Sequence, residues 1–377
     1  MINTDRSAMY RLDMLNEQHL KVNYQMSTGK KIDQGSDDSK VYTQDLHIND
    51  RIRTYEGLKV QLEKNNAQND VSDSTLNEIK NILDFIKTET IKARNDTNDD
   101  TSRNAIATQI EGAKENLYTL VNERVEDEYI FSGSQTNIQA FVKDETGKIS
   151  YNGNPNLRLA AVEEDSYRER GVTGFDIMAY DVGVAVDNQE LTFKEGERII
   201  DEQGREWKLN DANTVLVQYD EDGKATKNYV EVETEEQTQS DGSTKLVHTV
   251  ADIGTNEDET QRVFTVKRNT FDALDDLINA LRNNDGDEIS FGLEEVSNAY
   301  DAANEAHGQL GGRNATFEIA YERVSAKITH FNVLDVQNNS ADLAKVAMEA
   351  KQLELTYTSL YSTISKMNNL TLANYVN

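Results

Sequence analysis

The stretch LAKVAMEAKQLELTYTSLYSTISKM, residues 343–367, decides the architecture of this chain. Its apolar side chains alternate at spacings of three and four residues, which places them on one stripe of a helix. The stripe consists of Leu343, Val346, Ala350, Leu353, Tyr357, Leu360, Ile364 and Met367. Burial of one large apolar side chain stabilises a fold by roughly 1.5–3 kcal/mol, so the stripe requires a partner helix.

A weaker stripe of the same kind lies near the N-terminus, at Met9, Leu12, Leu15, Val22 and Met26. Helices with one apolar side at both ends of a chain predict pairing of the two ends. The partners are the other end of the same chain, neighbouring copies of the chain, or both. This pattern indicates an assembly subunit before it indicates an enzyme.

Composition narrows the functional classes. The chain of 377 residues has no cysteine, which excludes disulfides and thiolate metal sites, and a single proline, which favours long uninterrupted elements. Its formal net charge of −29 argues against nucleic acid and against an anionic membrane surface as partners. We expect no membrane insertion, because no apolar run reaches transmembrane length, and residues 1–15 lack the features of a secretory signal peptide.

Periodicity predicts helical regions in both halves of the chain. The first apolar stripe after the N-terminal helix comprises Leu58, Leu62, Leu76, Ile79, Leu83, Ile86 and Ala93. Polar residues interrupt it at Asn65, Asn69 and Ser72. A buried asparagine on such a stripe fixes the register at a cost in stability, whereas an exposed one is only solvated, and both readings stay open. After a polar turn at 95–102, a second stripe predicts an antiparallel helical hairpin: Ile106, Ile110, Ala113, Leu117 and Leu120.

A period of two replaces the helical period between residues 137 and 268. Strands are predicted at 189–193, 214–219, 229–232 and 262–267, with a hairpin turn at 220–223. Helix returns at Phe271, breaks at 283–287 and is interrupted again at Gly311 and Gly312. The middle of the chain is therefore expected to form a β-rich insert between helical flanks.

These patterns predict an α+β fold, in which both terminal parts form a long α-helical bundle and coiled coil around an inserted β-rich domain. The expected divisions are a terminal coiled-coil domain (1–38 and 335–377), a helical bundle domain (39–140 and 269–334) and a β-rich outer insert (141–268).

Four short motifs resemble segments of the bacterial flagellin family. STGKKI (27–32) with GSDD (35–38), which holds Asp37 and Asp38, is similar to a flagellin turn. YIFSGSQT (129–136), which holds Phe131, Ser132 and Gly133, resembles an element of the flagellin-like proteins at the hook–filament junction. QLGGRN (309–314), with Gly311 and Arg313, and NLTLANY (369–375) are similar to later segments of the same family. Ser39 and Ala140 stand where those proteins often have proline.

The resemblance implies a structural, non-enzymatic subunit of the extracellular bacterial flagellum that joins hook to filament. Its implied partners are other copies of itself in a ring, the neighbouring axial proteins (a hook-side junction protein and flagellin) and an export chaperone. It implies export through the flagellar type III route without a cleaved signal peptide, and no cofactor or metal. The residues expected to pack between terminal helices and between subunits are Leu12, Leu15, Val22, Met26, Leu343, Val346, Leu353, Tyr357, Leu360, Ile364 and Met367.

Evidence for other chemistry is weak. The five histidines, at positions 19, 47, 248, 307 and 330, have no further ligand at metal-binding spacing. Asp220, Asp222 and Gly223 do not fit a calcium loop, and the sequence has no phosphate-binding glycine loop, GxSxG or HExxH. Three alternatives remain open: a flagellin of the filament itself, an adhesive or glycan-binding module in the insert, and an enzyme embedded in the insert.

Overall fold

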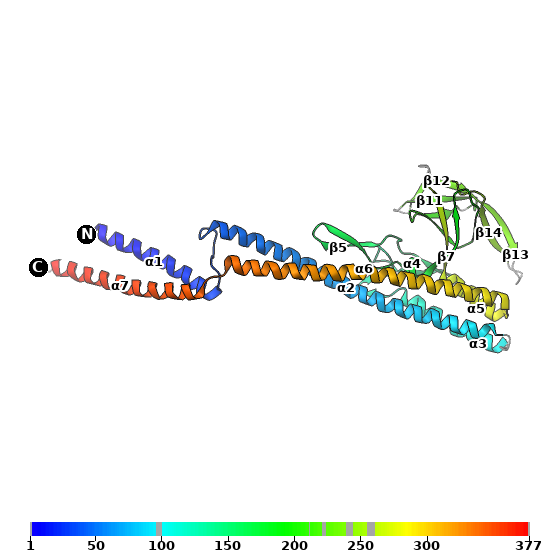
Figure 1. The fold of residues 1–377 in the computed structure, drawn as a ribbon, viewed down its shortest axis with the longest axis horizontal. Coiled ribbons are helices and arrows are strands. Elements are labelled where there is room, and N and C mark those ends of the chain that lie inside the picture. The colour runs from blue at the N-terminus through cyan, green and yellow to red at the C-terminus, as the bar shows by residue number, and fades with distance from the viewer. Residues whose placement is uncertain are drawn as a thin grey trace. The chain divides into compact units, whose positions relative to one another are not determined.

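A computed structural model of the chain describes residues 2–95, 100–210, 212–220, 224–238, 244–254 and 261–375. The chain divides into two compact units: Met1–Gln61 with Ala320–Asn377, and Leu62–Ile319. The α+β fold class is confirmed, since helices come before and after a β-rich insert along the chain (Figure 1). None of the helices in the described ranges is long and apolar enough to span a bilayer.

The first unit is entirely helical apart from its connections. It contains α1 (Ile2–Thr28), α7 (Leu343–Tyr375), the start of α2 (Ser39–Arg94) and the end of α6 (Gly286–Asn339). The chain ends α1 and α7 lie side by side (Figure 1). Between α2 and α6, the rings of Tyr55 and Phe331 stack with their centroids 5.7 Å apart.

The second unit has a helical core built from the predicted stripes. Leu76, Ile79, Leu83 and Ile86 of α2 are fully buried, and they share one apolar core with α6, α3 (Asp100–Leu120) and α5 (Thr270–Asn283). The predicted break at 283–287 is confirmed, because α5 ends at Asn283 and α6 begins at Gly286. The predicted polar turn at 95–102 extends too far, because α3 already begins at Asp100, and residues 96–99 lie outside the described ranges.

The predicted interruption at Gly311 and Gly312 is wrong, because α6 is continuous from Gly286 to Asn339. Each glycine in a helix costs about 1 kcal/mol relative to alanine. That penalty is outweighed here because buried side chains continue on both sides of the pair, with Leu310 and Phe317 fully enclosed.

Three short antiparallel hairpins and one helical turn come before the main β structure. The hairpins pair β1 (Arg124–Val125) with β2 (Glu128–Tyr129), β3 (Phe141–Lys143) with β4 (Ile149–Tyr151), and β5 (Arg158–Glu163) with β6 (Ser166–Arg170); α4 (Gly174–Met178) follows. Phe141, Ile149, Tyr151 and Met178 are buried in the same apolar core as the helices. This part of the insert therefore packs as a cover on the helical bundle.

The remaining strands form two antiparallel sheets. The larger has the order β12-β11-β10-β9-β15-β7 and the smaller β13-β14-β8. Their bounds are β7 Ala179–Val186, β8 Leu191–Lys194, β9 Arg198–Asp201, β10 Glu206–Leu209, β11 Val215–Tyr219, β12 Ala225–Glu231, β13 Glu233–Thr238, β14 Thr244–Val250 and β15 Val263–Asn269. The four predicted strands correspond to β8, β11, β12 and β15. The predicted hairpin is confirmed by the β11–β12 pairing, although its turn residues 221–223 lie outside the described ranges.

The two sheets enclose a separate apolar core. In this core the ring centroids of Trp207 and Phe264 lie 4.8 Å apart, and Ile199, Leu216 and Val250 are buried with them. Asp201 anchors the β9–β10 turn to this core, with its side chain only 2% exposed. It accepts hydrogen bonds from five donors: the backbone N–H of Gln203 and of Arg205, and the side chains of Arg205, Trp207 and Gln218.

We predict that Asp201→Asn destabilises this β core. Burial alone raises the pKa of the Asp201 carboxyl, but the hydrogen bonds donated by Trp207 and by Arg205 lower it below its usual range. The charged form is therefore the stabilising one. Its contribution is present above the unfolded pKa and is lost as the pH falls through the lower folded pKa. We expect a loss of about 1.5–3 kcal/mol at pH 7.

Trp207 is the only tryptophan of the chain, so urea unfolding followed by its fluorescence measures this effect directly. The loss relative to wild type should shrink below pH 4. A variant with the same midpoint as wild type at pH 7 would contradict the anchoring role. The control is Glu202→Gln, in the same turn but exposed, which should shift the midpoint little.

Candidate assembly surface and the motif-bearing core

The predicted pairing of the two chain ends is present within a single chain. Val22 of α1 packs against Val346 and Leu353 of α7, and all three are buried. Leu15 and Ala350 cover this small core from the sides. The spacing of three and four residues therefore does what the sequence predicts, since it aligns one stripe of α1 with one stripe of α7.

A polar contact extends the seam, the contact between α1 and α7 at Val22, Val346 and Leu353, toward the chain ends. The Tyr357 hydroxyl donates to Asn16 Oδ1 at 2.5 Å, and the Tyr357 ring meets His19 edge-on at 5.9 Å. A hydrogen bond between two helices holds only when the two side chains are in register. Tyr357 and Asn16 therefore favour one alignment of α1 with α7.

The other predicted packing residues have different environments. Leu12, Leu15, Tyr357, Leu360 and Ile364 are half-buried. Met26 and Leu343 are 50% and 55% exposed, so the pairing within one chain does not cover them. The side chain of Met367 lies outside the described residues. Packing of these side chains between subunits stays a prediction.

Sequence reasoning missed a second set of apolar side chains on the terminal helices. These side chains are exposed on the isolated chain: Tyr10, Met14 and Leu20 of α1, and Met348, Leu355 and Tyr361 of α7. Met9, which the N-terminal stripe includes, is also exposed. Met348 and Leu355 are seven residues apart and follow the seam positions Val346 and Leu353 by two, which places them on the opposite side of α7. The seven-residue spacing of Met348 and Leu355 is the sequence pattern that could have identified this second apolar side of α7.

A short antiparallel contact joins the end of α1 to the start of α7. The backbone N–H of Ala341 donates to the carbonyl of Gly29 at 2.8 Å, and that of Lys31 donates to Asn339 at 2.6 Å. Gln25 of α1 closes the loop from its side by donating to the Lys31 carbonyl at 2.6 Å. These bonds connect segments that are about three hundred residues apart in the sequence, so they fix where the two terminal helices begin their pairing.

The paired aspartates have separate roles beside this contact. Asp38 Oδ1 accepts from the backbone N–H of Lys40 and of Val41, both at 3.1 Å, and thus caps the first turn of α2. Asp37 accepts from the backbone of Asp33 and lies 3.2 Å from Lys21 of α1. Burial works against the Asp37 charge, but these hydrogen bonds outweigh it and lower the pKa of its carboxyl. Asp38 therefore caps α2, and Asp37 stabilises the turn that precedes it.

The turn of Phe131, Ser132 and Gly133 lies in the core of the second unit. The Phe131 side chain is fully buried, and its carbonyl accepts from the backbone N–H of Gly174 at 2.7 Å. The Ser132 hydroxyl lies 2.9 Å from the carbonyl oxygen of Gln135, which closes the turn. Gly133 has φ +72°, a conformation that glycine adopts without strain.

Arg313, in the motif QLGGRN (309–314), contacts the same part of the second unit. Its Nη1 donates to the Gly171 carbonyl at 3.0 Å, and its Nη2 lies 3.7 Å from Glu169 of β6. The Phe131 turn and α6 thus both hold the segment 171–174, although they are about 180 residues apart in the sequence. Gly311 makes no comparable contact, since no atom lies within 4 Å of the position that a Cβ would occupy there. Phe131 and Arg313 thus both contribute to the packing around this segment.

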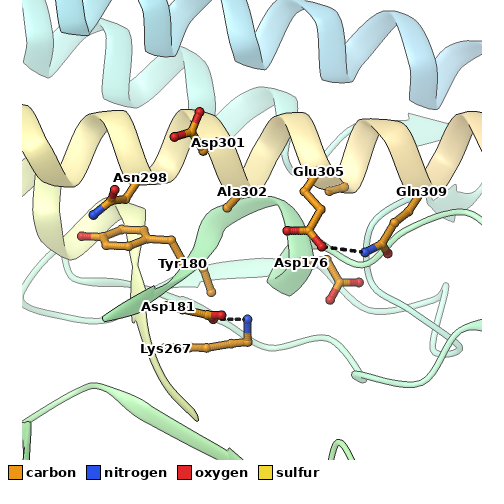
Figure 2. A pocket seen from close by; sticks show the side chains of 11 residues that line it. Asp176, Tyr180, Asp181, Lys267, Asn298, Asp301, Ala302, Glu305 and Gln309 are labelled. Carbon is orange, nitrogen blue, oxygen red and sulfur yellow. Dashed lines mark hydrogen bonds and ion pairs between the residues drawn. The ribbon is translucent and has the colours of Figure 1, made fainter. Parts of the chain in front are cut away.

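Charged side chains line one cavity of the second unit. A cavity of about 320 Å³ lies between β7 and α6 and is lined by Asp176, Asp181, Asp301 and Glu305 (Figure 2). Asp181 is paired with Lys267 at 2.5 Å. The Asp301 carboxylate points away from the other acids (Figure 2). Among the described residues, no group of three or more histidine, aspartate or glutamate side chains could hold a metal ion.

Comparison with known proteins agrees with this arrangement. Residues 2–136 match the model of the bacterial flagellin N-terminal helical region, which covers α1, α2, α3 and the Phe131 turn. None of the curated proteins matches the chain at a significant level.

Solved structures are similar to the chain at low sequence identity. The structure of a putative flagellar hook-associated protein from Vibrio parahaemolyticus is 13% identical, with a TM-score of 0.54 over 81% of this chain and 100% of that chain. The flagellar junction protein FlgL from Legionella pneumophila is 14% identical, with a TM-score of 0.42 over 75% of this chain and 99% of that one. The chain thus carries a flagellin-type N-terminal helical region within a fold that it shares with a flagellar hook-associated protein.

Proposed function

We propose that this chain is a structural, non-enzymatic subunit of the bacterial flagellum, positioned where the hook meets the filament. The observation that carries the proposal is the flagellin N-terminal region at residues 2–136 within a fold shared with a hook-associated protein. The packing roles of the motif residues also support it, because Phe131, Asp38 and Arg313 each make contacts that hold the fold together.

The terminal helices support a proposal of self-assembly. Met348 and Leu355 of α7 and Leu20 of α1 remain more than 60% exposed after α1 and α7 have paired. Apolar side chains of this size lose stabilisation in water, so a further surface must cover them. We propose that neighbouring copies in a ring, and the axial proteins above and below, supply that surface. The chain would then reach the tip by type III export with a chaperone that covers the same side chains.

The proposed domain division assigns assembly to the ends of the chain. Residues 1–38 and 335–377 would form the coiled-coil domain, residues 39–140 and 269–334 the bundle, and residues 141–268 the outer insert. The β sheets between Ala179 and Asn269 have their own core, which supports an outer position for this part of the insert.

Location in the cell tests the proposal. The chain has no cysteine, so Gln203→Cys in the exposed β9–β10 turn provides a single labelling site. Maleimide-gold on intact cells of the source bacterium should give one band between hook and filament, visible by electron microscopy. Unmodified cells are the control for labelling of other surface proteins. Label along the whole filament would instead identify a flagellin, and label away from flagella would overturn the proposal.

A further inference from the structure

The polar interruption of the α2 stripe is buried rather than solvated. Asn69 is 3% exposed and Ser72 is also buried, as is their neighbour Gln68, whereas Asn65 is half-buried. Residues of the β5–β6 hairpin and of the turn after β2 line a cavity together with this stretch. Polar side chains in such a position must find hydrogen-bond partners, because an unmet buried donor costs about 1–3 kcal/mol.

Most of the polar atoms here are satisfied by one network. Gln68 Nε2 donates to Glu128 Oε2 at 3.0 Å, while Gln68 Oε1 accepts from Arg170 Nη1. Glu128 in turn pairs with Arg158 of β5 at 2.7 Å. Ser72 donates its proton to the Gln68 backbone carbonyl at 2.9 Å, which leaves the lone pairs of its oxygen available.

Two donors are left over. Among the described residues, neither Asn69 Nδ2 nor Arg170 Nε has a hydrogen-bond partner, and both atoms are shielded from solvent. Burial, with a smaller contribution from Arg158, lowers the pKa of Arg170 to about 10, so its guanidinium keeps all its protons at neutral pH. Both unmet groups therefore require an acceptor, and neither can serve the other.

A small cavity adjoins both side chains. Its volume is about 10 Å³, and its lining includes Asn69, Ser72 and Arg170 together with Gly133 and Gly171. A cavity needs roughly 10–15 Å³ and two to four polar partners to hold one water molecule. The size and the polar lining both fit a single water.

We propose that this cavity binds one ordered water molecule, which accepts hydrogen bonds from Asn69 Nδ2 and Arg170 Nε. The water donates its own protons to oxygens of the lining, of which Ser72 Oγ has free lone pairs. A halide would accept from the same two donors, but it cannot donate, and it is larger than the space. The inference is independent of the proposed function.

The bound water explains why the α2 stripe is polar at this point. It joins the hairpin to α2 through hydrogen bonds, so apolar side chains at positions 69 and 72 would leave Arg170 Nε without any partner. The proposed water thereby links the hairpin to the Phe131 turn. Arg313 contacts the same place, since it donates to the adjacent Gly171 carbonyl.

A crystal structure of the full chain at 1.8 Å or better tests the proposal. We expect one density peak in the cavity, about 2.7–3.2 Å from both nitrogens. An empty cavity with the Asn69 amide reversed, so that its oxygen accepts directly from Arg170 Nε, would overturn the proposal. Bromide soaking distinguishes the remaining case, since an anomalous peak at the site would show that it binds a halide instead.

A measurement in solution gives a second test. Oxygen-17 relaxation dispersion counts water molecules with long residence times, and we expect Asn69→Leu to have one fewer than wild type. The matched control is Asn65→Leu, one turn earlier on the same stripe and only half-buried, which should leave the count unchanged. Equal counts in wild type and a folded Asn69→Leu variant would contradict the proposal, and the wild-type crystal structure decides the matter if that variant does not fold.

Discussion

We expect that replacing Leu353 with aspartate abolishes incorporation of the chain into flagella and releases α1 from α7, while residues 62–319 stay folded. Leu353 is 8% exposed and packs with Val22 and Val346 in the small core between the two helices. The substitution removes roughly 1.5–3 kcal/mol of apolar burial. It also places a carboxylate among the apolar side chains of Val22 and Val346, which costs several kcal/mol more. A core of three buried side chains does not supply enough stabilisation to offset a free-energy loss of that size.

Two measurements check this result. Amide hydrogen exchange on the purified variant should show lost protection in α1 and α7, with wild-type protection in α3 and α5. Immunoblots of flagella sheared from cells that express only the variant should then lack the protein. Normal flagella that contain the variant would refute the proposed role of the terminal seam.

Two matched variants separate pairing within the chain from packing between chains. Leu355→Asp changes an exposed side chain on the opposite side of α7, so the α1–α7 protection should persist while incorporation still fails. Gln352→Asp changes an exposed polar residue beside Leu353 and should affect neither. Normal incorporation of Leu355→Asp would show that this side of α7 is not an assembly surface.

Regular spacing is the part of the fold that sequence predicts well. The seam at Val22, Val346 and Leu353 and the buried run from Leu76 to Ile86 follow directly from a period near 3.6, because burial of one face requires it. The strands that became β8, β11, β12 and β15 were likewise predicted from a period of two and turn residues. In each case a local pattern and the final packing agree.

The failures arise where distant segments meet. Gly311 and Gly312 predict a break by local propensity, but the burial of Leu310 and Phe317 keeps α6 intact. The polar interruption at Asn69 could be read as solvated or buried, and only the position of Arg170 in a hairpin a hundred residues away decides it. Similarly, nothing in the local sequence of the Phe131 turn indicates that α6 holds the same segment 171–174 through Arg313.

Replacing Gly133 with alanine should destabilise the second unit by about 2–5 kcal/mol. Its φ of +72° costs a residue with a Cβ about 1–2 kcal/mol. The new Cβ would overlap the carbonyl oxygen of Asn154 and lie 2.9 Å from that of Asn156. Both are backbone atoms, and Ser132 and Ser134 bond to this same segment, so the turn cannot shift without breaking hydrogen bonds. Overpacking of this kind adds roughly 1–3 kcal/mol.

Gly147→Ala is the matched control for this prediction, since Gly147 has φ +89° but no atom within 4 Å of the added Cβ. It carries the conformational penalty without the overlap, and should therefore lose only about 1–2 kcal/mol. Urea unfolding followed by circular dichroism compares the two variants with wild type. If Gly133→Ala were no less stable than Gly147→Ala, the close approach at Asn154 would not be what requires glycine in this motif. A clearly larger loss would assign the glycine of the Phe131 turn to packing against residues 154–156, a contact that the motif itself does not reveal.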